Sequence, residues 1–320
     1  MFMKRVLKSI TLTGLTGIAG LVAFTAYESK RVEKLVPKVG TLVEVDGVTV
    51  HLSDVGEGRP LVFLHGLGGQ LRHFHALIDI LSQHHRVVSI DRPGSGYSQA
   101  LAGDACGPFE QAKLVYGVIR ALGLEKPIIV GHSLGGAVAL SLAWRHPEVC
   151  DGLALVAPLT HPTDVLPDAF KGLALEPPWL RRLLAWTLLS PMARWGPKAP
   201  LRQIFAPDPV PPDFGEAAGG FLGRRPKSYL STCSELRAVP KDLQELCHRY
   251  SELTVPVRML FGESDTILDP VVQGESMKDL LCDFELTLTP GGHMLPLTHP
   301  QMTSDWLLEA VRELSETERG

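Results

Sequence analysis

The 320-residue sequence has few of the features of nucleic-acid-binding, disulfide-rich or cofactor-dependent proteins. Its 31 Lys and Arg stand against 35 Asp and Glu, a formal net charge of −4. No basic excess is present to neutralise a phosphate backbone, so we expect no nucleic-acid partner. Only five cysteines are present and none has C-x-x-C spacing, which indicates ordinary thiols. Because phosphate-loop and dinucleotide motifs are lacking too, we expect no cofactor and no metal.

The first thirty residues contain a long stretch without charge directly after a basic start. Three basic residues open the chain, and the nineteen residues 9–27 contain no charged side chain. Crossing a bilayer takes about 20 apolar residues, so we predict an N-terminal membrane helix over residues 1–27 and a linker over 28–40. The side of the membrane is not fixed, because basic residues flank both ends.

Two other interpretations of this segment stay open. A cleavable signal peptide needs small residues at positions −3 and −1 of the cut, and cleavage after Ala26 would place Phe24 at −3. The segment could also be a helix that lies in the membrane interface or packs against the protein. The sequence therefore predicts a membrane-anchored protein with a single N-terminal span.

Eight short runs rich in Val, Ile and Leu follow the linker. The first two flank Asp46-Gly47, a two-residue hairpin signal, and the others are continuous apolar runs typical of strands buried on both faces of a parallel sheet. We expect strands at 42–45, 48–52, 60–66, 86–91, 127–133, 152–158, 255–262 and 283–290. Helical patterns lie between several of them, at 109–122, 134–146, 271–281 and 299–314.

This alternation predicts a doubly wound α/β fold with a mostly parallel eight-stranded sheet and helices on both faces. Residues 161–254 break the rhythm, because they hold thirteen of the 25 prolines and no convincing strand. We therefore predict a helical cap over 161–254, inserted after the sixth strand into a catalytic domain formed by 41–160 and 255–320.

The clearest chemical motif is Gly131-His132-Ser133-Leu134-Gly135. This G-x-S-x-G pattern lies between a predicted buried strand and a predicted helix, the setting in which it forms a nucleophile elbow. Small residues are needed because strand and helix approach closely around the sharp turn. The turn raises the hydroxyl of Ser133 above the sheet, so we predict that Ser133 is a nucleophile.

A serine nucleophile needs a base and a group that orients the base. His293 follows the last predicted strand and a Gly-Gly pair, and Asp265 follows the seventh strand. Asp269 precedes a proline and fits a helix cap better; Glu263 is the remaining rival. We predict the set Ser133, Asp265 and His293, in the chain order typical of one hydrolase class.

The loop His65-Gly66-Leu67-Gly68-Gly69 ends the third strand. Its glycines allow the backbone to approach the nucleophile, so we expect the N–H groups of Leu67 and Leu134 to form an oxyanion hole. His65 itself fits a bracing role in the loop better than a catalytic one.

Taken together, the motifs HGLGG (65–69), DRPGSGYS (91–98), GHSLGG (131–136), GESD (262–265) and GGHMLPLTHP (291–300) resemble the α/β-hydrolase family in its capped serine-hydrolase branch. The resemblance covers about 48–314 and implies that Asp91, Gly94, Gly96 and Ser98 shape a structural turn. A serine nucleophile argues against the dehalogenases and epoxide hydrolases of that family, which attack through a carboxylate. The family also contains esterases, lipases, C–C bond hydrolases and perhydrolases, so the triad does not name the substrate.

The cap segment 177–205 holds Trp179, Trp186 and Trp195, five basic residues and no acidic one. This composition is typical of a membrane interface or of a pocket for an acyl chain, so we list the three tryptophans as candidate substrate-binding residues. The alternative is a cap helix that packs its leucines on the domain beneath.

We therefore expect a serine hydrolase of the monoacylglycerol-lipase-like type that acts through an acyl-enzyme on carboxylic esters, with acylglycerols or other lipid-like acyl esters as the expected substrates. Its expected partners are a small-molecule ester and, through the N-terminal segment, a membrane. A C–C bond hydrolase of the meta-cleavage type, a perhydrolase-like enzyme with the same triad, and a non-enzymatic ligand-binding receptor remain as alternatives. The oligomeric state is not readable from the sequence.

Overall fold

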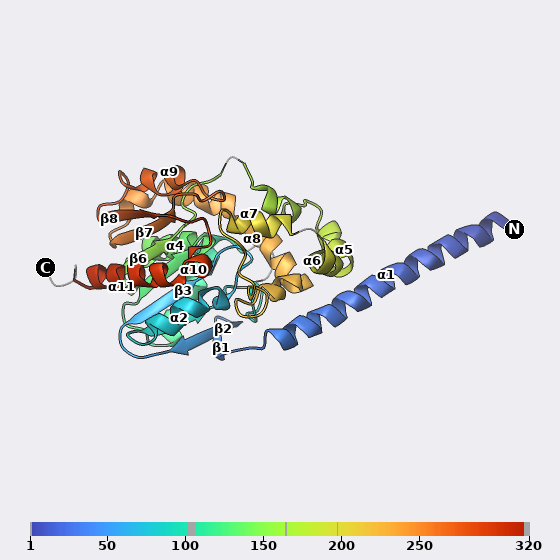
Figure 1. Cartoon of the computed structure of the whole chain (residues 1–320), viewed down its shortest axis with the longest axis horizontal. Helices are drawn as coiled ribbons and strands as arrows, with labels where there is room; N and C mark the ends of the chain where they lie inside the picture. Colours follow the sequence, from blue (N-terminus) through green and yellow to red (C-terminus); the bar gives the residue numbers. More distant parts are fainter. Residues whose placement is uncertain (1, 102–105, 164, 197, 317–320) are drawn as a thin grey trace.

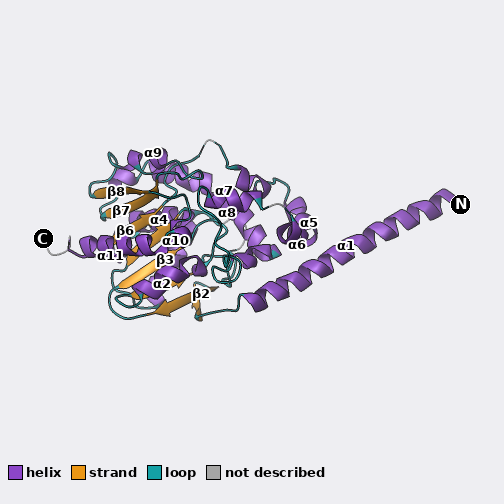
Figure 2. Ribbon diagram, in the orientation of Figure 1, coloured by secondary structure: helices purple, strands orange, loops and turns teal. Residues whose placement is uncertain are grey.

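An eight-stranded sheet in the order β1-β2-β4-β3-β5-β6-β7-β8 forms the centre of the molecule (Figures 1 and 2). The computed structural model describes residues 2–101, 106–163, 165–196 and 198–316. For residues 2–14 and 316 it describes the backbone only. The strands are β1 (Thr41–Val45), β2 (Val48–Val55), β3 (Pro60–Leu64), β4 (Arg86–Ile90), β5 (Ile128–His132), β6 (Gly152–Val156), β7 (Val257–Gly262) and β8 (Phe284–Thr289).

The sheet is parallel except at β2, which pairs antiparallel with both β1 and β4. The hairpin at Asp46-Gly47 forms as predicted, with both residues at positive φ. All side chains of β5 and β6 are buried, because helices cover both faces, as their continuous apolar sequences predicted. The predicted strands and mostly parallel sheet are thus confirmed.

Helices α3 (Pro108–Ala121) and α4 (Leu134–Arg145) contribute to the hydrophobic core on one face of the sheet. Helices α2 (His75–Leu81) and α11 (Pro300–Glu316) form a second core with the other face. The short α10 (Leu295–Thr298) precedes α11. Apolar side chains from both layers close the sheet off from water, which is the main source of stability in such a fold.

Two helical segments differ from the prediction. Helix α2 and the 3₁₀ turn η1 (Leu71–Phe74) before it were not expected. The helix expected over 271–281 is divided into α9 (Pro270–Gln273) and the 3₁₀ turn η6 (Glu275–Met277). At the end of α9 the buried Gln273 leaves the helix pattern to bond another segment: its Oε1 accepts the backbone N–H groups of Thr160 and His161 at 2.7 and 2.9 Å.

The chain between β6 and β7, which includes the predicted cap 161–254, contains helices and 3₁₀ turns, and its described residues contain no strand. Its helices and 3₁₀ turns are α5 (Pro178–Thr187), α6 (Leu189–Trp195), α7 (Ala199–Phe205), α8 (Pro226–Cys247), η3 (Asp168–Leu173), η4 (Gly220–Arg224) and η5 (Tyr250–Glu252). Another 3₁₀ turn, η2 (Pro147–Val149), lies between α4 and β6.

A long N-terminal helix, α1 (Phe2–Leu35), packs its C-terminal half against the cap and projects beyond the body of the molecule at its other end (Figure 1). The helix continues through residues expected as a linker, so only 36–40 remain irregular. The reason is a buried carboxylate: Glu28 accepts hydrogen bonds from Arg194 at 2.6 Å and Arg224 at 3.3 Å in the cap. Arg31 adds a third bond within the helix.

None of the described helices has both the length and the apolar character needed to cross a bilayer. The predicted N-terminal membrane helix is therefore not supported. The side chains of its first half, up to residue 14, lie outside the described residues.

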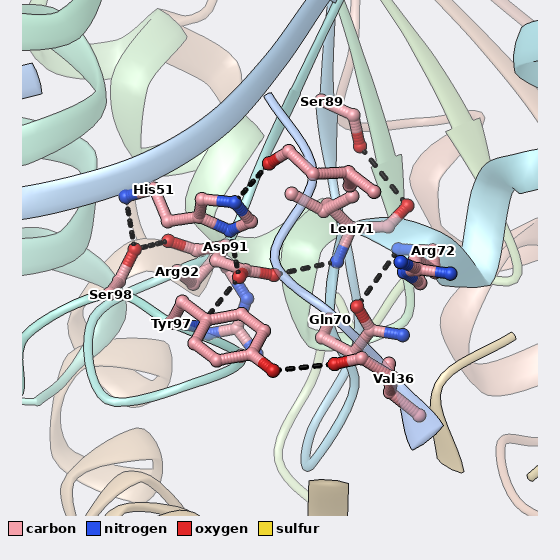
Figure 3. A network of polar contacts seen from close by, with 12 residues as sticks. Val36, His51, Gln70, Leu71, Arg72, Ser89, Asp91, Arg92, Tyr97 and Ser98 are labelled. Atoms are coloured by element: carbon pink, nitrogen blue, oxygen red, sulfur yellow. Dashed lines mark hydrogen bonds and ion pairs between the residues drawn. The ribbon is translucent and has the colours of Figure 1, made fainter. Parts of the chain in front are cut away.

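The turn after β4 is organised by Asp91, which is fully buried (Figure 3). Its carboxylate accepts hydrogen bonds from the His51 ring at 2.6 Å and from the backbone N–H groups of Leu71 and Tyr97, each at 2.8 Å. A Cβ at Gly96 would overlap this carboxylate. The structural role that the family resemblance implied for this turn thus agrees with its geometry.

Candidate active site

The elbow at Ser133 has the backbone that the G-x-S-x-G motif predicted. Ser133 lies between β5 and α4 with φ 55° and ψ −124°, a conformation that strains a residue with a side chain by about 1–3 kcal/mol. A Cβ at Gly135 would overlap the carbonyl oxygen of Leu64, so only glycine allows the helix to begin so close to the neighbouring strand. This tight junction holds the serine hydroxyl at the carboxyl ends of the strands.

Three side chains predicted to work together do meet at this edge of the sheet. The Nε2 atom of His293 lies 3.0 Å from the Oγ atom of Ser133, and Nδ1 lies 2.7 Å from Oδ2 of Asp265. The other carboxylate oxygen of Asp265 accepts the backbone N–H groups of Ile267 and Leu268. With the Nδ1 proton donated to Asp265, Nε2 is left free to accept the proton of the serine hydroxyl.

The rivals of Asp265 do not enter this arrangement. Asp269 is the N-cap of α9 and accepts the N–H of Val271 at 2.9 Å, as its position before a proline indicated. Glu263 is exposed and does not line the two cavities next to the serine.

The loop after β3 passes directly against the nucleophile. A Cβ on Gly66 would lie 2.9 Å from the Cβ of Ser133, so the glycine is needed for the close approach. Among the described residues no acceptor is found for the N–H of Leu67. Leu67 and Ser133 line the same two cavities, and Leu134 lines one of them. The two predicted oxyanion donors therefore border the space next to the hydroxyl.

Three buried histidines surround the site: His65, for which the sequence indicated a bracing role in the loop, and His73 and His132, to which it assigned no role. Burial lowers the pKa of His132 to about 3 and that of His73 to about 4, and it lowers the pKa of His65 well below its ordinary value. All three rings are therefore neutral near pH 7. The His132 Nε2 donates to the backbone oxygen of His293 at 2.9 Å, which ties the loop of the base to the elbow.

Two cavities meet at Ser133, and Leu67 and Phe170 also border both. The first has a volume of about 280 Å³ and includes His293 and Met294 in its wall together with cap residues such as Leu201, Phe214 and Leu222. The second has a volume of about 350 Å³, and its wall is mostly aliphatic: Leu134, Leu159, Leu166, Leu236, Val239, Leu243, Ile267 and Leu268 contribute. Among the described residues no Lys or Arg lines the first cavity, and Arg237 at the second is exposed.

The three tryptophans predicted as substrate contacts lie elsewhere. None of them lines either cavity; they lie on the outside of the cap, with Trp179 67% and Trp195 68% exposed. The Trp195 ring stacks on Phe24 of α1, with centroids 5.1 Å apart. We use the name outer cap face for the exposed apolar side chains of α5, of α6 and of the residue between them: Trp179, Leu183, Trp186, Leu188, Met192 and Trp195.

Curated relatives match only part of the chain. A 2-hydroxy-6-oxo-6-phenylhexa-2,4-dienoate hydrolase from Burkholderia cepacia is 34% identical over 113 residues, which are 34% of this chain and 40% of the relative. A 2-hydroxymuconate semialdehyde hydrolase from Pseudomonas putida is 37% identical over 133 residues, 38% of this chain and 43% of the relative. The chain thus spans less than half the length of these relatives.

Solved structures match the fold over nearly the whole chain. A putative lipase from Acinetobacter baumannii AYE aligns with a TM-score of 0.70 at 21% identity, covering 92% of this chain and 97% of its own. A membrane phospholipase A aligns with a TM-score of 0.67 at 20% identity, covering 98% and 99%. The model of the alpha/beta hydrolase fold matches residues 59–300. The chain therefore belongs to the α/β-hydrolase fold family.

Proposed function

We propose that this protein is a serine hydrolase that cleaves carboxylic esters with apolar acyl groups. The observation that carries the proposal is the hydrogen-bonded series from Ser133 through His293 to Asp265, with distances of 3.0 and 2.7 Å. Such an arrangement turns a weakly acidic hydroxyl into a nucleophile.

In the proposed reaction the Oγ of Ser133 attacks the ester carbonyl while its proton passes to Nε2 of His293. The N–H groups of Leu67 and Leu134 hold the resulting oxyanion. The imidazolium then gives its proton to the leaving alcohol oxygen, which leaves an acyl group on Ser133. A water molecule activated by the same imidazole releases the acid and restores the serine. Asp265 holds the imidazole in the required tautomer throughout.

The two cavities give the substrate an orientation. The alcohol oxygen must lie near His293, because this residue protonates it, and His293 lines the first cavity. We therefore assign the leaving alcohol to the first cavity and the acyl chain to the second. The aliphatic wall of the second cavity suits a hydrocarbon chain, which gains about 0.8 kcal/mol of binding free energy per buried methylene.

The names of the curated relatives favour a second candidate, a hydrolase of C–C bonds in meta-cleavage products. The dienoate named for the first relative is a carboxylate, and binding it beside the nucleophile calls for a cationic partner. The described part of the first cavity's wall contains no such residue, and Arg237 of the second cavity is exposed. The absence of a buried cationic side chain from the described walls of the two cavities favours the neutral ester as substrate.

The outer cap face supports a lipid-like substrate delivered from a membrane surface. Tryptophan and leucine side chains stand exposed there beside the basic Arg182 and Lys198, and the composition matches that of segments lying in the bilayer interface. Helix α1 adds the exposed Leu15, Ile18 and Tyr27. We propose that this face and α1 attach the protein to a membrane; the structural neighbour named a membrane phospholipase A has a similar fold over 98% of this chain.

The direct test is hydrolysis of p-nitrophenyl esters from acetate to palmitate by the full chain in mild detergent, beside a vinylogous diketone of the meta-cleavage type. The proposal expects ester turnover that rises with chain length beyond acetate and is lost in Ser133→Ala. Faster cleavage of the diketone would favour the C–C hydrolase. Formation of a peracid from acetate and peroxide would favour the perhydrolase-like alternative. Tight binding of a ligand without turnover would favour the non-enzymatic receptor.

A further inference from the structure

The side chain of Arg92 lies behind the oxyanion loop and is completely buried. It follows Asp91 directly, so the turn in Figure 3 fixes where its backbone lies. From there Nε donates to the carbonyl oxygen of His65 at 2.7 Å, and Nη2 donates to the carbonyl oxygen of Gly66 at 2.8 Å. Two consecutive peptides of the oxyanion loop are therefore held by one guanidinium group.

The Gly66 carbonyl belongs to the same peptide group as the N–H of Leu67. Besides Arg92 it accepts the Nδ1 proton of His65 at 2.8 Å and the N–H of Gly69 at 3.1 Å. The tautomer of His65 follows from its other nitrogen, which accepts the N–H of Arg92 at 3.0 Å. Three donors, one of them a full cation, thus converge on one end of the peptide whose other end is the proposed oxyanion donor.

Hydrogen bonds accepted by a carbonyl polarise the peptide group and strengthen its N–H as a donor. They also fix the orientation of that N–H before the transition state forms, and such preorganisation is the main source of oxyanion stabilisation. The planar fork of arginine suits this task, because it holds both carbonyls in one fixed geometry, which a lysine could not.

The other side of the guanidinium faces the cap. Nη1 donates to Oε1 of Glu235 on α8 at 2.7 Å, and the carboxylate is 1% exposed. Gln111 of α3 contacts both partners: it accepts a short bond from Arg92 and donates to Glu235 at 3.2 Å. A buried arginine needs such a counter-charge. Here that charge is supplied by the cap, 143 residues further along the chain.

We propose that Arg92 and Glu235 are positioning residues that fix the orientation of the Leu67 N–H in the oxyanion hole. The ability of this N–H to stabilise the oxyanion then depends on α8 being packed in its place beside Arg92. The inference rests on the proposed function, because an oxyanion hole has a task only in acyl transfer. The cap then has a second role besides covering the substrate, because its Glu235 supplies the carboxylate that holds the guanidinium group of Arg92 behind the loop.

The test compares Arg92→Met with the double variant Arg92→Met/Glu235→Leu in the full chain. Arg92→Met removes the clamp but leaves a buried carboxylate unpaired, so some loss of melting temperature is expected. The double variant removes both charges, and apolar replacement of both partners typically restores stability. Arg258→Met is the matched control. Arg258 lies on β7, away from the site, and pairs with Asp283 at 2.7 Å and with Glu313 at 2.9 Å.

Two readouts separate positioning from support of the fold. We expect both Arg92 variants to lose roughly 10- to 100-fold in kcat for esters with KM within about twofold, less than the ~10²–10³-fold cost of deleting an oxyanion donor. The rate of Ser133 phosphonylation by an alkyl fluorophosphonate, whose P=O enters the oxyanion hole, should fall by the same factor. Arg258→Met should lower the melting temperature and leave both rates unchanged.

The inference would be overturned if kcat, the phosphonylation rate and the melting temperature of the double variant all returned to their wild-type values. Arg92 and Glu235 would then only support the fold. Wild-type rates in Arg92→Met would overturn it as well. If the wild-type chain neither cleaves any ester nor reacts with the fluorophosphonate, the proposed function itself fails. That result is distinct, because it does not depend on Arg92.

Discussion

The carboxyl edge of the sheet and the outer cap face use polar and apolar groups in opposite ways. At the sheet edge Asp265 and His293 are buried and each ring nitrogen or carboxylate oxygen has a hydrogen-bond partner. On the outer cap face large apolar side chains are exposed, with Trp179 and Trp195 about two-thirds accessible. Under the proposed function the difference corresponds to two separate tasks: the sheet edge performs the bond chemistry, and the cap selects the molecules that reach it.

Removing the nucleophile should separate the two tasks most completely. We expect Ser133→Ala to lower ester kcat by roughly 10⁵- to 10⁶-fold, as removal of a triad serine does in other hydrolases. Folding should be unaffected, because the alanine loses only one hydroxyl. Turnover and melting temperature of the purified variant check this, and binding to vesicles should equal that of the wild type. Substantial residual turnover would remove Ser133 from the mechanism.

Asp265→Asn should give the next largest effect. The amide cannot accept the Nδ1 proton of His293 with a full negative charge, and it favours the wrong tautomer, which costs about 10⁴-fold in a comparable triad. We expect a loss of that order in kcat with little change in KM. Glu263→Gln is the matched control, since Glu263 is exposed. Equal losses in the two variants would contradict the assignment of Asp265.

Acid should destabilise the sheet edge through its neutral histidines. The folded-state pKa of His73, about 4, lies below the ordinary value of 6.5. The unfolded chain therefore binds more protons, and stability is fully present above pH 6.5 and lost as the pH falls toward 4. For His73 alone we expect about 2–3 kcal/mol less free energy of unfolding at pH 4.5 than at pH 7.

Urea unfolding of the wild type and of His73→Gln at pH 4.5 and pH 7 measures this contribution of His73 to the free energy of unfolding. The variant should show a smaller difference between pH 4.5 and pH 7 than the wild type. An unchanged difference would mean that the pKa of His73 is not lowered in the folded protein.

Narrowing the second cavity should change substrate choice and not the chemistry. Leu236→Trp fills part of the proposed acyl site, and each methylene no longer accommodated should cost about fourfold in kcat/KM, since ~0.8 kcal/mol per methylene corresponds to that ratio. We expect the optimal p-nitrophenyl ester to shorten by several carbons while acetate turnover is kept. Leu201→Trp in the first cavity is the control. A shortened acyl optimum there, and none in Leu236→Trp, would reverse the assignment of the cavities.

The smallest effect on soluble substrates is expected on the outer cap face. Trp179→Ala with Trp186→Ala should change turnover of p-nitrophenyl butyrate less than twofold, because neither residue lines a cavity. Co-sedimentation with vesicles of phosphatidylcholine and anionic phosphatidylglycerol should fall several-fold, since both side chains would insert in the interface. Undiminished sedimentation would leave membrane attachment to α1 alone or refute it for this face.

Local patterns were enough to predict the sheet edge. Buried parallel strands appear as continuous apolar runs, and Ser133, Asp265 and His293 each follow such a run. The prediction of a mostly parallel sheet therefore placed all three at the same edge. The elbow was predictable because the turn has room only for glycine at positions 131 and 135, where a Cβ would overlap backbone atoms. Helix α2 was missed because its seven residues bury only Leu77 and Leu81 fully, too few for a clear period.

Long-range pairs were not predictable. Nothing adjacent to Arg92 in the sequence indicates that Glu235 lies 2.7 Å away. Glu28 was assigned to a linker because a charged stretch after an apolar one usually is solvated, yet three arginines surround its carboxylate in the fold. The tryptophans of the cap were identified as unusual from composition, but composition does not say whether a helix turns such residues inward or outward.

The central claim is that Ser133 carries the acyl group between two half-reactions. Rapid quenching of the full chain with p-nitrophenyl octanoate, followed by mass spectrometry of the peptide that contains residue 133, tests it directly. The account predicts one octanoyl group on Ser133 that forms with the first burst of p-nitrophenol and decays at the steady-state rate. Turnover of the ester with no adduct on Ser133, or with an adduct elsewhere, would contradict it.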